Sequence, residues 1–164
     1  WVWRDNGDCA TNHDLCYARS RDLRHWENSA GTPLSLPMTS DSPGIVVLPT
    51  APRGSGLINM CGSIGFDGGK RPILSFHLYD RDGASRIFTL RLNPDGQHQL
   101  VPHGNWPKAE RWEFSGGGSI RQMVFAPPVR FQPDGTLLQD FEFVGRESGC
   151  WQIISYHIVK SKKK

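Results

Sequence analysis

The sequence lacks any long hydrophobic run. No apolar stretch approaches the roughly 18 residues that a membrane-spanning helix needs. The opening WVWRDNG also has no basic segment, apolar core or small-residue cleavage site of the kind that marks a signal peptide. Charge is nearly balanced: the formal net charge is +3, and part of it comes from the terminal KSKKK, which we interpret as a solvated tail. We therefore expect neither a membrane nor a nucleic-acid partner, and the mild basicity suits an acidic one.

Cysteine is sparse. The four residues, Cys9, Cys16, Cys61 and Cys150, allow two disulfides in three pairings. Cys16 lies within an apolar, strand-like run, which predicts a buried thiol. Cys9, His13 and Cys16 are close enough in sequence to contribute to a zinc site, but their spacing fits no strong zinc pattern and no fourth ligand is evident. We expect no cofactor, and a structural zinc or calcium ion is the alternative.

Sustained helical periodicity is absent as well, because no stretch combines an apolar repeat of 3.6 residues with caps at both ends. Turn chemistry is abundant instead. The chain has 18 glycines, 12 prolines and Asp-Gly pairs at 67–68, 82–83, 95–96 and 134–135. Short runs rich in β-branched and aromatic residues lie around these pairs, such as RPILSFHLY, SRIFTLRL and TLLQDFEFV. Asp-Gly between such runs predicts hairpins with type I′ turns, so the fold class is all-β and antiparallel.

A weak repeat organises these strands. Residues 57–104 contain four strands, A to D; residues 105–160 repeat A to C, residues 1–33 supply B to D, residues 34–56 form an inter-blade loop, and 161–164 are the basic tail. Four-stranded antiparallel sheets that recur along a chain are typical of β-propeller blades. We therefore predict one partial β-propeller domain of about three blades. Because Trp1 falls inside a strand, we expect N-terminal blades of the same protein as the partner that completes the ring.

The segment SRDLRHW, residues 20–26, is a degenerate Asp box. In this motif a serine and an aspartate cap the turn between strands C and D, and an aromatic residue packs beneath it. Ser20, Asp22 and Trp26 supply these three elements. We expect the motif to have a structural role.

At this point the chain resembles a known family. The segment WVWRD…TNHDLCYARSRDLRHWENSAGTPLSLPMT is similar to the BNR-repeat family of polysaccharide lyases, which includes ulvan lyases and rhamnose–glucuronate lyases. The similarity continues more loosely through LINMCGSIGFDGGKRPILSFHLYD and GGGSIRQMVFAPPVRFQPDG. The resemblance implies a sialidase-like seven-bladed propeller that acts by β-elimination on a uronic-acid polysaccharide. It also implies a secreted or periplasmic location and an anionic polysaccharide as partner. The paired-histidine and Tyr-Pro-x-Phe…Tyr-Arg motifs of the family do not occur in this sequence, and we expect them upstream of Trp1.

The candidate catalytic residue is His13, at the connection between strands B and C, which opens on the ligand-binding face of a propeller. The resemblance places it where the upstream histidine of the family acts, and a neutral imidazole can accept or donate a proton near pH 7. The alternative is that Asn12, His13 and Asp14 only hydrogen-bond the loop backbone.

The candidate substrate-binding residues are chosen for their blade positions. An arginine fork matches a uronate carboxylate in two-point geometry, and Arg4 ends strand B on the binding face. The full set comprises Arg4, Asn12, His77, Tyr79, Arg121 and Arg146. For each arginine the alternative is a solvated or ion-paired surface residue, and for His77 it is a satisfied core histidine.

Two other functions stay open. SRDLRHWE also resembles a turn of five-bladed-propeller glycoside hydrolases, which need separated carboxylates as nucleophile or base and as acid. Asp5, Asp14 and Asp80 are the acids near the appropriate strand ends. The third interpretation is a non-catalytic carbohydrate-binding propeller.

Overall fold

The computed structural model describes residues 1–58, 62–117, 123–144 and 150–158, and its elements are almost all strands. The all-β, antiparallel prediction is confirmed. The strands are β1 (Val2–Arg4), β2 (Asn12–Cys16), β3 (Arg19–Ser20), β4 (Trp26–Glu27), β5 (Pro33–Leu34), β6 (Val46–Leu48), β7 (Ser63–Phe66), β8 (Pro72–Tyr79), β9 (Ser85–Arg91), β10 (Gln99–His103), β11 (Val124–Phe125), β12 (Arg130–Phe131), β13 (Leu137–Val144) and β14 (Trp151–Ile158). Two short 3-10 helices, η1 (Cys9–Thr11) and η2 (Lys108–Glu110), complete the described elements.

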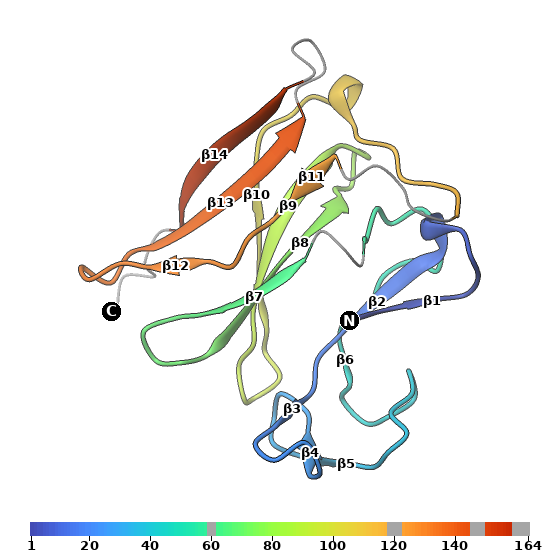
Figure 1. Ribbon diagram of the computed structural model, residues 1–164, viewed down its shortest axis with the longest axis vertical. Coiled ribbons are helices and arrows are strands. Elements are labelled where there is room, and N and C mark those ends of the chain that lie inside the picture. Colours follow the sequence, from blue (N-terminus) through green and yellow to red (C-terminus); the bar gives the residue numbers. More distant parts are fainter. Residues whose placement is uncertain (59–61, 118–122, 145–149, 159–164) are drawn as a thin grey trace.

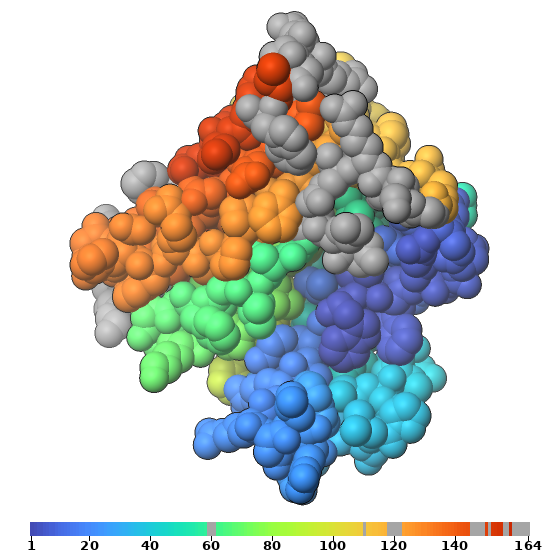
Figure 2. Space-filling view, in the orientation of Figure 1, coloured from blue at the N-terminus to red at the C-terminus, as the bar shows by residue number. Residues whose placement is uncertain are grey.

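Three sheets lie side by side in chain order, as expected for successive blades (Figure 1). The first contains β1, β2 and β6; the second contains β7 to β10; the third contains β11 to β14. A fourth, small sheet is made of β3, β4 and β5. In the space-filling view the third sheet, in orange, lies directly against the second, in green (Figure 2), which agrees with the contacts of β11 with β8 and of β12 with β7.

The second sheet is a complete four-stranded antiparallel meander in the order β10-β9-β8-β7. Its strands lie where the sequence predicted A to D. The central strands β8 and β9 are buried along most of their length because the neighbouring sheets cover both of their faces. This sheet is therefore the packed centre of the described structure.

The Asp-Gly pairs form the predicted hairpin connections, but the turns are not of type I′. Of the two residues Asp82 and Gly83, only Gly83 has a positive φ, +80°. The amide of Gly83 donates to Asp80 O at 2.9 Å, and Asp80 Oδ1 accepts from the amides of Asp82 and Ala84. This is a type I turn followed by a left-handed glycine, in which Asp80 closes the loop with its own side chain.

The innermost strand of the third sheet is broken into β11 and β12, where a single strand was expected. Both pieces pair with β13, on either side of Gln139. The break contains Pro127 and Pro128, which have no amide hydrogen to donate to the ladder. Gln139, fully buried, compensates: its Nε2 donates to Pro127 O at 3.0 Å, and its Oε1 accepts from Ser75 Oγ of the second sheet at 2.6 Å.

The first sheet differs from the prediction. Its outer strand is β6, which lies within the stretch 34–56 expected to be an inter-blade loop, whereas the segment around Trp26 belongs to the small separate sheet. The cause is Asn28, whose Oδ1 accepts from the amides of Ala30 and Thr32 and turns the chain back into β5 immediately after β4. The chain then returns to pair β6 with β2.

Apolar side chains fill the spaces between the sheets. One cluster joins the first and second sheets and includes Leu15, Val47, Leu74 and Phe76. A second cluster, rich in aromatic residues, joins the loop of residues 106–114 to the third sheet. Within the described part of the chain, no helix is long and apolar enough to cross a membrane.

Candidate functional site

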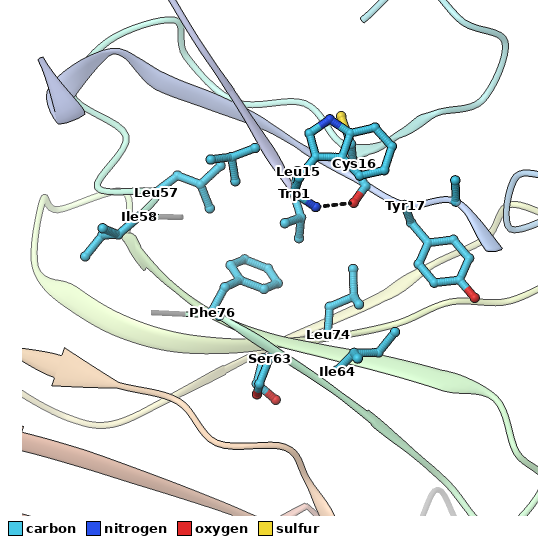
Figure 3. A pocket seen from close by; sticks show the side chains of 14 residues that line it. Trp1, Leu15, Cys16, Tyr17, Leu57, Ile58, Ser63, Ile64, Leu74 and Phe76 are labelled. Atoms are coloured by element: carbon cyan, nitrogen blue, oxygen red, sulfur yellow. Dashed lines mark hydrogen bonds between the residues drawn. The ribbon is translucent and has the colours of Figure 1, made fainter. Parts of the chain in front are cut away.

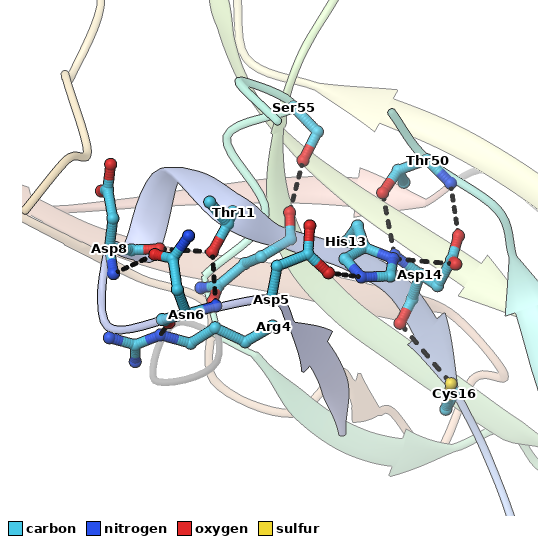
Figure 4. Close-up of polar contacts among 11 residues, drawn as sticks. Arg4, Asp5, Asn6, Asp8, Thr11, His13, Asp14, Cys16, Thr50 and Ser55 are labelled. Atoms are coloured by element: carbon cyan, nitrogen blue, oxygen red, sulfur yellow. Dashed lines mark hydrogen bonds and ion pairs between the residues drawn. The ribbon is translucent and has the colours of Figure 1, made fainter. Parts of the chain in front are cut away.

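Three of the residues that the sequence singled out, Arg4, Asn12 and His13, lie where β1 turns into β2. We call this cluster the β1–β2 site and define it as residues 4–14 together with Thr50, Arg53 and Ser55. Figure 4 shows many of its polar contacts. The pairing of Arg4 with Asn12 and of Trp3 with His13 places the candidates at one end of the first sheet. The loop of residues 49–56 covers that end and links it to the second sheet.

Asp8 holds the connecting loop in shape. It caps η1, with Oδ1 accepting from the amide of Ala10 at 3.0 Å and from that of Gly116 at 2.7 Å. Arg53 Nη2 lies 2.7 Å from Asp8 Oδ2. The backbone hydrogen bonds from Ala10 and Gly116, followed by that of Arg53, hold the pKa of Asp8 below its ordinary value. A single carboxylate thus connects three separate segments of the chain.

Arg4 is exposed, but its guanidinium turns back onto its own loop. Nε donates to Asn6 O at 2.7 Å, and Nη2 donates to Gly7 O. These bonds stabilise the turn and fix the plane of the guanidinium at the mouth of the site. A substrate carboxylate would meet the donors that remain, or would displace these carbonyl contacts.

His13 lies between two carboxylates (Figure 4). Its Nδ1 is 2.9 Å from Asp14 Oδ2, and its Nε2 is 3.1 Å from Asp5 Oδ1. Asp14 is itself fixed by Thr50, whose amide donates to Asp14 Oδ1 and whose Oγ1 accepts from the amide of Asp14, both at 2.9 Å. The imidazole side chain is 16% exposed and that of Asp5 is 57% exposed, so the Nε2 side faces solvent.

This arrangement favours the charged form of the ring over the neutral one. A neutral imidazole has one N–H and can donate to only one of two ionised carboxylates, whereas the imidazolium donates to both. The hydrogen bond of Asp14, together with that of Asp5, accordingly raises the pKa of His13, although partial burial opposes the shift. Compared with an unperturbed imidazole, the ring of His13 is therefore shifted toward the protonated form.

Asn12 is buried at 1% exposure, and neither its Oδ1 nor its Nδ2 has a hydrogen-bond partner among the described residues. Its backbone carbonyl accepts from Ser55 Oγ at 3.2 Å. The buried position corrects the expectation that Asn12 contacts substrate directly, because its side chain does not reach the surface.

His77 and Tyr79 of β8 are connected to the β1–β2 site by hydrogen bonds to the backbone of Gly56 and Ser55. His77 Nδ1 donates to Gly56 O at 2.7 Å, and the amide of Tyr79 donates to Ser55 O at 2.9 Å. His77 is completely buried and ringed by Tyr79, Trp112 and Phe114, and this burial lowers its pKa to about 4. It is therefore a neutral core histidine, the alternative that the sequence left open, and not a surface contact for substrate.

Tyr79 is half-buried and already engaged. Its hydroxyl donates to Trp112 O at 2.6 Å, and the guanidinium of Arg111 lies 3.5 Å above the ring centre. Burial raises the pKa of Tyr79, so the phenol stays protonated. The other two predicted binding residues, Arg121 and Arg146, lie outside the described residues.

The cysteine–histidine zinc alternative gains no support from the geometry. Cys9 and Cys16 are buried free thiols, and burial raises the pKa of Cys16 to about 11. The ring nitrogens of His13 face carboxylates. Among the described residues no group of three or more His, Cys, Asp or Glu side chains could hold a metal ion. Cys61 lies outside those residues.

Sequence reasoning missed Thr50, Arg53 and Arg111 as members of this end of the molecule. Thr50 and Arg53 come from the stretch expected to be a loop, 36 and 45 residues away from Asp14 and Asp8. No local pattern could have found such contacts. Asp5 carried a signal, because it stands one residue after Arg4 at the same strand end.

Antiparallel sheets that pack side by side, with a polar cluster at one end, define the class of protein as an all-β, blade-containing protein. Residues 1–106 match the BNR repeat-containing family, which is more than half of the 164 residues, and the chain belongs to that family. The match is consistent with a sialidase-like, carbohydrate-related propeller. No curated protein matches the chain.

Proposed function

We propose that this protein is a polysaccharide lyase, which cleaves a uronic-acid-containing glycan by β-elimination, and that the β1–β2 site contacts the glycan. The single observation that carries the proposal is the position of the His13 ring at the solvent-facing end of the first sheet, where its two nitrogens contact the carboxylates of Asp14 and Asp5. Family membership supports a carbohydrate as the ligand. A polysaccharide substrate would place the protein outside the cytoplasm, in the periplasm or secreted.

In this proposal His13 acts as the acid. A base supplied outside the β1–β2 site removes the proton from C5 of the uronate, the electron pair forms the C4–C5 double bond, and the bond from C4 to the leaving oxygen breaks. His13 Nε2 then donates its proton to that oxygen. Asp14 keeps the ring oriented through Nδ1, and the exposed Asp5 swings away from Nε2 when the glycan enters.

Arg4 would bind the uronate carboxylate, because a guanidinium can present two parallel N–H donors to it. Asp8 and Arg53 would position the loop that carries Arg4. The anionic polysaccharide and the N-terminal blades are thus the two partners in this proposal, the first as substrate and the second as the source of the base.

The test is elimination activity with a matched set of variants. The protein, together with any N-terminal blades of its full-length form, is incubated with a uronate polysaccharide, and the unsaturated product is followed by its ultraviolet absorbance. His13→Gln should lower kcat by roughly 10²–10⁴-fold, whereas Arg4→Gln should act mainly on KM. His25→Gln is the control, because His25 is exposed on the small sheet. Absence of unsaturated product, or full activity of His13→Gln, would reject the proposal.

A non-catalytic carbohydrate-binding propeller is the second candidate, and one observation favours it. The polar groups of Arg4, His13 and Tyr79 are already paired within the protein. Such a site binds a glycan through surfaces fixed in advance and needs no proton transfer. Glycan binding without product would support this candidate, and release of reducing sugar without unsaturation would instead indicate a hydrolase.

A further inference from the structure

The two ends of β1 have different surroundings. Trp1, just before the strand, lines an apolar cavity together with Leu15 and Phe76 (Figure 3). The loop after the strand is polar (Figure 4), and its residues Asn6 and Gly7 are exposed. Asn6 is the one asparagine of the chain that a glycine follows. This end of β1 therefore presents a dipeptide with chemistry of its own.

The peptide bond between Asn6 and Gly7 is open to an internal reaction. The backbone nitrogen that follows an asparagine can attack the side-chain amide carbon, Cγ, and glycine hinders this attack least because it has no Cβ atom. Around Gly7 nothing lies within 4 Å of the place where a Cβ atom would stand. Among the described residues, none accepts a hydrogen bond from the Gly7 amide. The nitrogen is therefore accessible and is not held by another contact.

Arg4 activates this nitrogen as a nucleophile. The peptide bond shares charge by resonance between Gly7 N and Asn6 O, so an anion formed at the nitrogen lies partly on that oxygen. Arg4 Nε donates to Asn6 O at 2.7 Å, and Arg4 Nη2 donates to Gly7 O. The guanidinium thereby stabilises the anion that forms when the Gly7 amide loses its proton, because hydrogen bonds between charged groups are the stronger ones.

The side chain of Asn6 is held as the electrophile. Its Oδ1 accepts from the amide of Asp8 at 2.8 Å, which draws electrons away from Cγ. Asp8 is itself fixed, because its carboxylate caps η1 and accepts from the amide of Gly116. One donor thus stabilises the nucleophile and another polarises the electrophile. Donors fixed in advance at the atoms where charge develops are what lowers the barrier in an active site.

We propose that Asn6 is a modification site, at which this loop converts its own asparagine to aspartate and isoaspartate with the help of Arg4. Gly7 N gives up its proton and bonds to Asn6 Cγ, the bond from Cγ to Nδ2 breaks, and ammonia leaves with that proton. Water then adds to one of the two carbonyl carbons of the cyclic imide and opens it. Opening at one carbon gives aspartate at position 6, and opening at the other gives isoaspartate. Nothing is oxidised or reduced, and solvent water is the co-reactant.

The modification changes the charge at the mouth of the β1–β2 site. Either product carries a new carboxylate close to Arg4. In isoaspartate the main chain also runs through the former side-chain carbon, so Asn6 O and Asn6 Oδ1 no longer hold their places as acceptors for Arg4 and for the amide of Asp8. Under the proposed function, the new carboxylate would compete with a uronate for the guanidinium of Arg4. The modification itself does not depend on that function.

The test follows the mass of the peptide that contains Asn6. The chain is kept in neutral buffer at physiological temperature, and samples are digested with pepsin in acid and analysed by mass spectrometry. Conversion of Asn6 raises the mass because OH replaces NH₂, whereas isomerisation at an Asp-Gly pair leaves it unchanged. Labelling with an isoaspartyl methyltransferase identifies the isoaspartate. Asn28 is the internal control, because it is buried and its side chain donates to Pro43 O and accepts from the amides of Ala30 and Thr32.

We expect Asn6 to convert while Asn28 stays intact. Arg4→Gln should slow the conversion by about tenfold, the order of effect of losing one hydrogen bond from a charged group. Arg24→Gln, which removes an exposed arginine from the small sheet, should leave the rate unchanged. Gly7→Ala should slow the conversion as well, because its Cβ atom hinders the attacking nitrogen.

Two results would overturn the proposal: an intact Asn6, or equal rates for the parent chain and Arg4→Gln. A third comparison separates the folded loop from its local sequence. In denaturant the parent chain and Arg4→Gln should convert at the same rate, and a difference that persists there would also overturn the proposal, because Arg4 would then act without the contacts described. No glycan enters the assay, so its outcome is independent of the test of the proposed lyase.

Discussion

Gly65 and Val129 lie in such close contact that the second and third sheets meet backbone to backbone. A Cβ atom on Gly65 would approach Val129 Cγ2 at 2.7 Å, its amide nitrogen at 2.9 Å and its carbonyl oxygen at 3.0 Å. Rotation of the valine side chain cannot relieve the last two contacts. The absence of a side chain at residue 65 therefore sets how closely the two innermost strands approach.

Gly65→Ala should lower the free energy of unfolding by about 1–3 kcal/mol, the usual cost of forcing an extra carbon into a packed interior. Gly7→Ala is the control, because a Cβ atom there would meet nothing within 4 Å and the backbone needs no positive φ. Denaturant titration of the two variants measures the difference. Equal stability would mean that the two sheets do not approach as described.

His77 should make the protein less stable in mild acid. Its pKa is about 4 in the folded chain and ordinarily 6.5, because burial disfavours the charged ring. Between these values the unfolded chain binds more protons, so the stability contribution of His77 is complete above pH 6.5 and is lost as the pH falls toward 4. His77→Asn, which can still donate to Gly56 O, should flatten this part of the stability profile.

The measurement for His77 is the melting temperature of both proteins from pH 7 to pH 4. Other acid-sensitive groups contribute equally to the two curves, so their difference isolates residue 77. Parallel curves would show that His77 titrates normally and is accessible to solvent.

His13 should have the opposite pH dependence. Its pKa is raised, first by the hydrogen bond of Asp14, so its contribution is complete below the ordinary value of 6.5 and is lost as the pH rises through the folded value. His13→Gln should therefore destabilise the protein most in mild acid and least in alkaline buffer. An NMR titration of the imidazole measures the pKa directly, and Asp14→Asn should lower it. A pKa at or below 6.5 in the parent chain would contradict the double contact with Asp5 and Asp14.

Trp26→Ala should cost about 2 kcal/mol of stability, less than the roughly 3–5 kcal/mol of a fully buried aromatic residue. Trp26 is only half-buried, and it packs against the cluster of Cys16, Leu34 and Ile45. Leu23→Ala in the same hairpin is the control, because Leu23 is 76% exposed. Thermal melting of both variants distinguishes a packing role for Trp26 from a purely local one.

The second sheet was predictable because its signals are local. Asp-Gly turns, short apolar runs and regular spacing all lie within 50 residues, and neighbouring strands pair in sequence order. The Asp box was predictable for the same reason: Ser20 Oγ accepts from the amide of Leu23, and Asp22 Oδ1 accepts from the amides of Arg24 and His25. These hydrogen bonds connect residues no more than three positions apart.

The first sheet and the β1–β2 site were harder to predict from the sequence, because contacts between residues far apart in the chain determine their structure. β6 reaches β2 across about 30 residues, and the side chain of Asn28 diverts the chain before a longer strand can form. The protonation of His13 depends on Asp5, on Asp14 and, through Asp14, on Thr50. Residue type and spacing identified the histidine as a candidate, but only the three-dimensional contacts show that two carboxylates raise its pKa.

The two prolines between β11 and β12 have a consequence for how the third sheet opens. A continuous edge strand separates from its neighbour as one unit, since each broken ladder bond weakens the next. Here the ladder of hydrogen bonds is already interrupted between β11 and β12, and the side-chain amide of Gln139 donates to Pro127 O within the interruption. Residues 124–125 and 130–131 can therefore detach from β13 in separate events, and exchange at one segment need not report on the other. The innermost strand of this sheet thus consists of two short pieces, β11 and β12, which pair with β13 separately and have the buried Gln139 between them.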